Sequence, residues 1–139
     1  MIREILDIGA GKWPVRGATR AIDRVKPPDT EIRRPDSLIE YQQAKAERLP
    51  YPDNFFKKVV SRWALGPRIF RMEAYAEVYR VLQPGGRVEV RLLWKDRRYK
   101  QRIIQRLEKA GINVYGEHKK LYRGLNKQFT EFIICGRKT

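Results

Sequence analysis

The stretch that decides the fold is Ile5-Leu6-Asp7-Ile8-Gly9-Ala10-Gly11, close to the start of the 139-residue sequence. It predicts a short apolar strand over residues 4–8 that leads directly into a Gly-x-Gly turn, where the missing Cβ atoms let the backbone come close to a ligand. A second strand is expected over residues 19–23 and ends in Asp23, an acid placed to accept hydrogen bonds from ribose hydroxyls. The sequence therefore predicts a nucleoside-type cofactor at the carboxyl end of a parallel sheet.

Strand and helix patterns alternate along the rest of the chain, which is typical of an α/β domain with a parallel sheet. We expect one domain over residues 1–139, because no linker, repeat or low-complexity segment interrupts the pattern. The turn Gln83-Pro84-Gly85-Gly86 ends the first expected helix, and Asp96 is the expected N-cap of the second. A loop rich in Lys and Arg is expected over residues 116–128, and 40–48 can also be read as helix. The further strands are expected at 38–43, 58–61, 87–93, 112–115 and 129–135, and the helices at 71–82 and 96–109.

The connection between the first two strands is unusually short. Only residues 9–20 join them, and Pro14 stands early in that segment, so its helix is at most a turn or two long. Dinucleotide-binding folds rest a pyrophosphate on the N-terminus of this helix and place a third glycine where this chain has Pro14. The short connection therefore favours a cofactor that carries no phosphates.

The composition fits a folded and strongly basic protein. Hydrophobic residues make up 42% and aromatic residues 11% of the chain, which argues against disorder. The net charge is +15 and the pI is near 10.3. Residues 95–139 hold thirteen Lys and Arg against four acids, so nine of the fifteen net charges lie in the last third. Such a field attracts polyanions; the alternative is a soluble basic surface, such as the charge-rich surface of a protein from a thermophile.

Signals for targeting, disulfides and metals are absent from the sequence. No apolar run is long enough to span a membrane and no signal peptide is evident, so we expect a cytoplasmic protein without membrane contact. A single cysteine, Cys135, excludes an internal disulfide and a cysteine-rich zinc site. It lies in an apolar stretch, so we expect a buried core thiol rather than a catalytic nucleophile. We expect no metal site.

In five segments the sequence resembles the class I S-adenosylmethionine-dependent methyltransferases, near the branch called methyltransferase type 11. The segments keep the order and spacing of that family, and they are residues 5–11, 21–25, 46–56, 59–61 and 77–87. The resemblance implies an α/β, Rossmann-like fold with a mostly parallel seven-stranded sheet whose last strand is antiparallel. The N-terminal helices that precede the first strand in the family are absent from this sequence, so a more open cofactor site is expected.

The resemblance also implies where S-adenosylmethionine binds. Asp7 and the turn at residues 9–11 would lie beside its methionine part, Asp23 would hold its ribose, and residues 46 and 47 would flank its adenine. Three positions depart from the family, since Trp13 replaces a glycine and both Lys45 and Lys57 replace acids. The implied cofactor-binding residues are Asp7, Gly9, Ala10, Gly11, Asp23, Arg24, Ala46, Glu47 and Ser61.

The sequence assigns no catalytic residue, because methyl transfer from a sulfonium mainly requires an in-line nucleophile. The candidates near the methyl group are Ser61, Arg62 and Trp63, and Trp63 can be read as a base-stacking or as a core aromatic. This segment lacks the two prolines of enzymes that methylate exocyclic amines. His118 can be read as a base or as a solvated histidine of the basic loop. A basic stripe, which either follows a phosphate backbone or is a solvated face, comprises Arg98, Arg102, Lys109, Lys119, Lys120, Arg123 and Lys127.

Three functions are compatible with these patterns. The first is an RNA methyltransferase that acts on ribosomal or transfer RNA, which the basic last third favours. It would recognise RNA with its own surface, as a homodimer, or with a protein partner that completes the site. The second is a protein or small-molecule methyltransferase whose charge is incidental. The third is a cofactor-binding accessory subunit without activity of its own.

Overall fold

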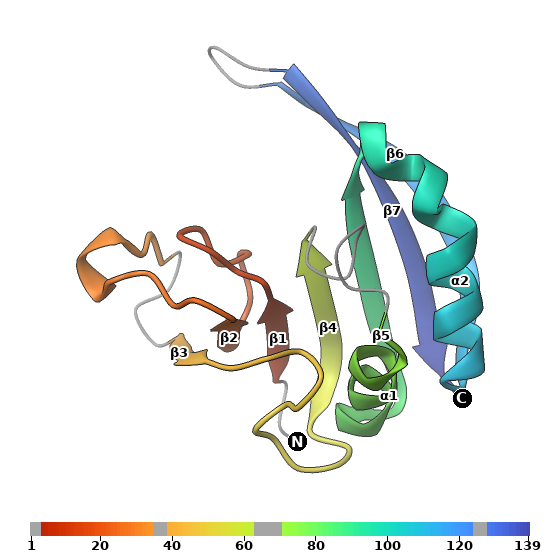
Figure 1. The fold of residues 1–139 in the computed structure, drawn as a ribbon, viewed down its shortest axis with the longest axis horizontal. Helices are drawn as coiled ribbons and strands as arrows, with labels where there is room; N and C mark the ends of the chain where they lie inside the picture. Colours follow the sequence, from red (N-terminus) through yellow and green to blue (C-terminus); the bar gives the residue numbers. More distant parts are fainter. Residues whose placement is uncertain (1–3, 35–38, 63–70, 124–127) are drawn as a thin grey trace.

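A single mixed sheet is the frame of the molecule (Figure 1). The computed structural model describes residues 4–34, 39–62, 71–123 and 128–139, and their strands form a seven-stranded sheet in the order β3-β2-β1-β4-β5-β7-β6. Neighbouring strands from β3 to β5 are parallel, whereas β7 is antiparallel to both β5 and β6. This is the Rossmann-like sheet that the sequence predicted. The strands are β1 (Ile5–Ile8), β2 (Arg20–Asp23), β3 (Glu40–Gln43), β4 (Phe56–Arg62), β5 (Leu82–Leu93), β6 (Ile112–Arg123) and β7 (Gln128–Lys138).

The two α-helices of the described residues, α1 (Met72–Val81) and α2 (Lys100–Lys109), pack on the same face of the sheet (Figure 1). Short 3₁₀ helices, η1 (Asp29–Glu31) and η2 (Trp94–Tyr99), complete the helical structure of this part of the chain. Each α-helix buries residues three or four positions apart, and these meet alternate residues of the central strands. The centre of this core comprises Ala74, Tyr75, Val78 and Val81 of α1, Ile103 and Leu107 of α2, and Val59, Val88, Val90 and Leu92 of the sheet.

The opposite face of the sheet carries no α-helix of the described residues and is largely polar at its centre. Lys58 Nζ lies 3.1 Å from Glu89 Oε1, and Arg91 Nη2 lies 3.0 Å from Glu89 Oε2, which makes an ion-pair chain across β4 and β5. These three side chains remain partly exposed. By strand register, the residues of β4 and β5 on this face are Lys58, Val60, Arg62, Arg87, Glu89 and Arg91.

The connection from β1 to β2 contains no helix, whereas the sequence allowed a helix of one or two turns. Residues 9–19 form turns instead. Local hydrogen bonds replace the helix: the amide of Ala18 donates to the carbonyl of Val15 at 3.1 Å, and the amide of Thr19 donates to Ile5 at 2.9 Å. Ala10 from this segment packs with Ala21, Ile39 and Tyr41 in a small second cluster. The chain thus passes from one strand to its neighbour with little covering structure.

Three expectations about element limits are wrong. The fifth strand begins at Leu82, opposite Phe56, rather than at residue 87, and the register with β4 shifts before Arg87. The helix before it ends at Val81, as the turn at residues 83–86 predicted. The second α-helix does not begin behind Asp96, since residues 94–99 form η2 and the N-cap of α2 is Tyr99, which makes no side-chain capping bond. The basic loop expected over residues 116–128 is mostly a hairpin of β6 and β7.

Aromatic rings lie beside two of the hairpin's cations, Lys119 and Lys120. Lys120 Nζ lies 5.0 Å from the ring centroid of Tyr122, and the Tyr122 ring stacks on that of Phe129 with centroids 4.8 Å apart. Cross-strand aromatic pairs of this kind stabilise a sheet. His118 is therefore an exposed residue of β6 rather than of a loop.

Candidate cofactor site

The turn after β1 depends on glycine. Gly9 and Gly11 have φ angles of 72° and 57°, in the left-handed region that residues with a Cβ rarely adopt. The amides of Gly9 and Ala10 both donate to the carbonyl of Ile22, at 2.9 and 3.1 Å, which fastens the turn to β2. A Cβ built on Gly11 would meet no atom within 4 Å. The turn therefore presents bare backbone to open space at the carboxyl edge of the sheet.

Asp23, the last residue of β2, lies against this turn. Its Oδ2 accepts a hydrogen bond from the amide of Gly11 at 2.9 Å, and its Oδ1 accepts one from the amide of Val25 at 3.2 Å. The hydroxyl of Tyr41 on β3 donates to the carbonyl of Gly11 at 2.8 Å, so two strands hold the turn. Since each carboxylate oxygen can accept two hydrogen bonds, Asp23 keeps the capacity to accept from a pair of ribose hydroxyls.

Asp7 is fully buried at the centre of the site. Its Oδ2 accepts a hydrogen bond from the amide of Val15 at 2.7 Å and lies 3.4 Å from Nη2 of Arg62. Its Oδ1 has no hydrogen-bond partner among the described residues. Burial raises the pKa of Asp7 to about 6, although the Arg62 charge and the bond from Val15 act in the opposite direction. A buried carboxylate oxygen without a donor is costly, so this atom calls for a donor from outside the described residues.

Arg62 ties β4 to the glycine turn. The sequence placed it beside the methyl group, but its Nη2 donates to the carbonyl of Trp13, and lies 3.4 Å from the carbonyl of Ala10 and from Oδ2 of Asp7. These contacts show that Arg62 positions the turn, and its place beside the methyl group stays a prediction. Ser61, one residue earlier, is buried at the end of β4 beside Ile8. Trp63, the third candidate, lies outside the described residues, as does Lys127 of the basic stripe.

The segment expected to flank adenine is less well formed as a site. Ala46 is buried in the main core, while Glu47 is half-buried and both Lys45 and Arg24 are exposed. Trp13, at the departure from the family's glycine, is 64% exposed. A hydrogen bond thus joins Gly11 to Asp23, and Gly9 is bonded to Ile22 beside it, whereas among the described residues no side-chain hydrogen bond or ion pair joins Arg24 or Glu47 to this group.

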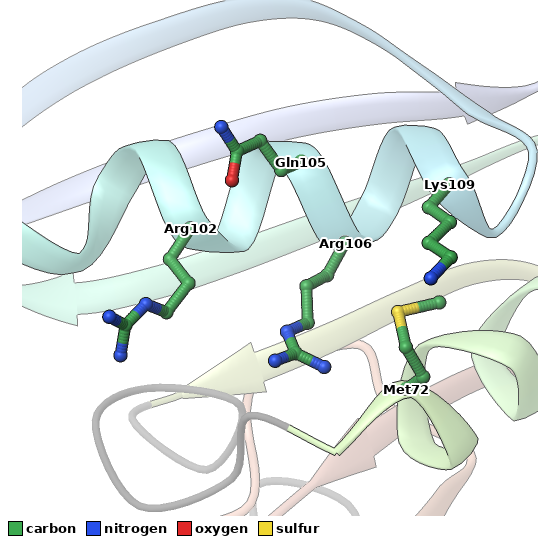
Figure 2. Close-up of a pocket in the computed structure, with 5 residues that line it drawn as sticks. All are labelled: Met72, Arg102, Gln105, Arg106 and Lys109. Atoms are coloured by element: carbon green, nitrogen blue, oxygen red, sulfur yellow. The ribbon is translucent and has the colours of Figure 1, made fainter.

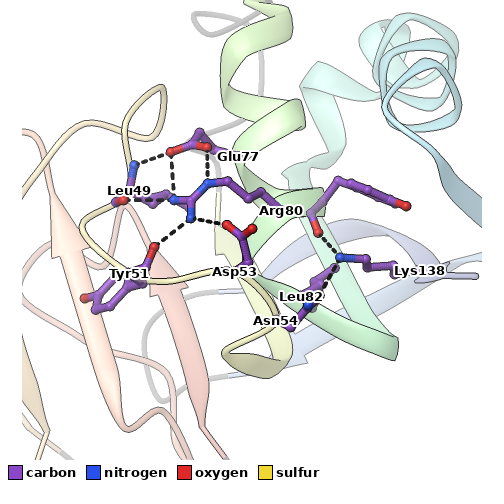
Figure 3. Close-up of polar contacts among 9 residues, drawn as sticks. Leu49, Tyr51, Asp53, Asn54, Glu77, Arg80, Leu82 and Lys138 are labelled. Carbon is purple, nitrogen blue, oxygen red and sulfur yellow. Dashed lines mark hydrogen bonds and ion pairs between the residues drawn. The ribbon is translucent and has the colours of Figure 1, made fainter.

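An ion-pair network that the sequence analysis did not single out anchors this segment (Figure 3). The Arg80 guanidinium donates to Glu77 Oε2 at 2.6 Å, to the carbonyls of Leu49 and Tyr51 at 3.1 and 2.8 Å, and to Asp53 Oδ1 at 2.9 Å. Glu77 Oε1 also accepts from the amide of Leu49 at 2.9 Å. The pair fastens residues 49–53 to α1. Its signal in the sequence was Glu-x-x-Arg spacing on the polar side of a helix.

The residues of this site fit S-adenosylmethionine. The partnerless Oδ1 of Asp7 can accept from the cofactor's ammonium group, and Asp23 can accept from its ribose hydroxyls. The turn at residues 9–11 allows close approach of the ligand. No triad of phosphate-binding amides at a helix N-terminus accompanies the turn, since residues 9–19 contain no helix. These features suit a nucleoside cofactor without phosphates.

The basic stripe separates into two groups. Arg102 and Lys109 line a pocket on α2, together with Arg106 (Figure 2). The other described members lie on or near the hairpin: the Arg98 guanidinium stacks on the Tyr99 ring, Lys119 lies over Trp94, Lys120 lies over Tyr122, and Arg123 ends β6. The stripe is therefore not one continuous track.

The described residues contain no group of three or more His, Cys, Asp or Glu side chains placed to hold a metal ion. None of their helices is both long and apolar enough to cross a membrane. Cys135 is a buried free cysteine, and burial raises the pKa of its thiol.

Proteins of similar sequence are methyltransferases. The ubiquinone/menaquinone biosynthesis C-methyltransferase UbiE of Enterobacter sp. (strain 638) is 39% identical over 80 residues, which are 58% of this chain and 29% of that protein. The same enzyme of Psychromonas ingrahamii is 44% identical over 52 residues, which are 37% of this chain and 21% of that protein. The chain thus matches less than a third of the length of these curated relatives.

Solved structures share the fold at low sequence identity. A SAM-dependent methyltransferase from Methanosarcina mazei superposes with a TM-score of 0.68 at 17% identity, over 97% of this chain and 92% of that one. One from Thermotoga maritima gives a TM-score of 0.70 at 14% identity, over 98% and 82%. The model of the methyltransferase domain family matches residues 15–90, which is more than half of the sequence. The chain belongs to the family of S-adenosylmethionine-dependent methyltransferase domains.

Proposed function

We propose that this chain binds S-adenosylmethionine at the carboxyl ends of β1 and β2 and catalyses methyl transfer. The observation that carries the proposal is the convergence of Asp7, Asp23 and the glycine turn, with Oδ1 of Asp7 left for a donor from outside the described residues. When bound, the cofactor would supply a sulfonium methyl group for transfer to a nucleophile, with the neutral thioether of the cofactor as the leaving group. The chain's own residues bind and orient: Asp23 accepts from ribose, Asp7 accepts from an ammonium group, and Arg62 holds the turn in place.

RNA is the substrate class that we propose first. The net charge of +15, with nine of those charges in the last third, supports it, because phosphate neutralisation supplies most of the affinity for nucleic acid. The hairpin of β6 and β7 adds cations packed on aromatic rings, a combination that suits single-stranded bases and phosphates together. A homodimer or a protein partner could extend this surface.

A small-molecule C-methyltransferase is the second candidate. It is favoured by the names of the curated relatives, which are C-methyltransferases of ubiquinone and menaquinone biosynthesis. On this reading the basic surface does not take part in substrate choice, and methyl transfer is insensitive to added RNA.

Incubation with radiolabelled S-adenosylmethionine and total cell extract tests the activity and separates the candidates. Label in the RNA fraction, lost on ribonuclease treatment, supports the first proposal; label in the organic-soluble fraction supports the second. Asp23→Ala should abolish incorporation, while Glu73→Gln on the exposed side of α1 should leave it unchanged. Cofactor binding by calorimetry without label in any fraction would contradict the enzyme and point to an accessory subunit.

A further inference from the structure

A basic pocket opens between α2 and the first turn of α1 (Figure 2). Its volume is about 300 Å³, and its lining residues are Met72, Arg102, Gln105, Arg106 and Lys109. Arg106 and Lys109 extend from one side of α2 towards Met72 at the start of α1, which forms an apolar wall, and Arg102 lies farther along the helix. The pocket lies on the helical face of the sheet, so it is separate from the glycine turn.

The spacing of these cations concentrates like charge. Residues 102, 106 and 109 are four and three positions apart, so their side chains are neighbours on the helix surface, where like charges repel. The only acid of α2 is Glu108, and it does not line the pocket. Among the described residues, neither Arg106 nor Lys109 forms an ion pair. The contrast is with Lys100 of the same helix, whose Nζ lies 3.1 Å from Oε1 of Glu117.

The lining chemistry identifies the class of ligand. Guanidinium groups present paired N–H donors that match phosphate oxygens, and a lysine ammonium adds a point charge. Gln105 also lines the pocket. A volume of about 300 Å³ is at the lower end for small-molecule sites, which leaves room for a phosphate and part of the group that bears it.

We propose that this pocket is a phosphate-binding site, occupied by the phosphate of a nucleotide-sized ligand or by a phosphodiester of a bound RNA. Arg106 and Lys109 are its principal anion-binding residues, with Arg102 at the end nearer η2. The site does not depend on methyl transfer or on cofactor binding, so it can be tested on the purified chain alone.

The test compares the wild type with Arg106→Gln/Lys109→Gln. Titration with inorganic phosphate, followed by amide chemical shifts of α2, should give saturable shifts at residues 102–109 in the wild type and at least about a tenfold weaker affinity in the double variant. The matched control is Arg33→Gln/Lys57→Gln, which removes the same charge at exposed positions away from the pocket and should retain wild-type affinity. Equal affinity in all three proteins, or shifts that do not saturate, would overturn the proposal.

Thermal unfolding guards against a variant that merely misfolds. Without ligand, the double variant should melt at or above the wild-type temperature, because like-charge repulsion is relieved. Phosphate should then raise the melting temperature of the wild type and of the control but not that of the double variant. A rise of equal size in the double variant would contradict the site.

The source of the phosphate is resolved with two further probes. A nucleoside monophosphate and a ten-nucleotide single-stranded RNA are titrated into the same three proteins at fixed salt. If both lose affinity in the double variant by a similar factor, the pocket accepts a phosphodiester. If only the monophosphate does, the pocket takes a terminal phosphate. If neither does while inorganic phosphate also binds normally, the proposal fails, whatever the outcome of the methyl-transfer assay.

Discussion

The guanidinium of Arg62 lies 3.4 Å from the buried carboxylate of Asp7 and also donates to the carbonyl of Trp13. Arg62, at the end of β4, thereby joins the Asp7 carboxylate on β1 to Trp13, at the far end of the glycine turn. The two residues belong to different strands that are neighbours in the sheet. The shape of the turn is therefore set from outside the turn itself.

Arg62→Ala should weaken both the fold and the cofactor site. Removing one partner of a buried ion pair leaves the other uncompensated, and we expect a loss of about 2–4 kcal/mol in the free energy of unfolding, reduced to the extent that Asp7 takes up a proton. Affinity for S-adenosylmethionine should fall by about tenfold or more, because the turn loses its fastening. Urea unfolding and calorimetry measure the two effects. Arg16→Ala, at an exposed position of the same connection, is the control and should change neither by much.

Asp7 should make the stability of the protein depend on pH. Burial raises its pKa to about 6 in the folded state, above the value of 3.8 for an exposed carboxyl group. The folded state therefore holds the proton longer than the unfolded state, and this group's contribution to stability is greatest below about pH 4 and declines as the pH rises to about 6, by up to about 3 kcal/mol.

The measurement is the difference in unfolding free energy between the wild type and Asp7→Asn at several pH values from 4 to 8. Asparagine cannot ionise. The unfolding free energy of the variant should therefore rise relative to that of the wild type as the pH rises from about 4 to about 6, with no further change above that range. A difference that is independent of pH would show that Asp7 titrates normally.

The Glu77–Arg80 network should stabilise the conformation of residues 49–53 more than it stabilises α1. Arg80→Lys keeps the charge but cannot reach all of the acceptors on Leu49, Tyr51 and Asp53, so we expect a loss of about 1–3 kcal/mol. Hydrogen exchange should rise selectively at the amide of Leu49, which loses the orientation of its Glu77 acceptor. The control is Glu73→Gln, an exposed acid of the same helix. Uniform exchange across α1 and the segment would argue against a local anchor.

Lys138 should act as a buried connector between the last strand and α1 (Figure 3). Its Nζ lies 2.9 Å from the carbonyls of Tyr79 and Leu82 and from Oδ1 of Asn54. Lys138→Met would leave these acceptors without their donor, and we expect a loss of about 2–4 kcal/mol in unfolding free energy. Arg137→Met, at the exposed neighbouring position, should cost about 0.5 kcal/mol through its contact with the Tyr115 ring. Equal losses in the two variants would show that Lys138 does not connect the last strand to α1.

The sequence predicted the sheet because each strand carries its own signal. The apolar runs at β1, β4 and β5 and the Asp23 ending of β2 are local patterns, and they were placed within a few residues of the strands observed. Both strands of the hairpin were predicted, at 112–115 and 129–135, but their extension into residues 116–123 was missed, because it is held by cross-strand pairs that the sequence does not reveal, such as Tyr122 on Phe129. A run of Lys and Arg resembles a loop until its cross-strand partners are known.

The part of the candidate site that is formed by the backbone of the Gly-x-Gly turn could be predicted from the sequence. Gly11 and Asp23 meet because adjacent parallel strands end at one edge of the sheet, and their part in cofactor binding stays a prediction. The role of Arg62 was not predictable, since the direction of a long side chain depends on which carbonyls the turn exposes. The same holds for Arg80, whose acceptors come from a segment about thirty residues away.

The polar sheet face described above has a thermal consequence. With both α-helices on one side, the ion-pair chain of Lys58, Glu89 and Arg91 occupies a surface that a second helical layer would otherwise make apolar. Unfolding such a domain exposes less apolar area per residue, and apolar exposure is what raises the heat capacity of the unfolded state. The heat-capacity change should therefore fall below the usual value of about 12–15 cal/mol/K per residue, and the stability of this domain should vary only gently between cold and warm surroundings.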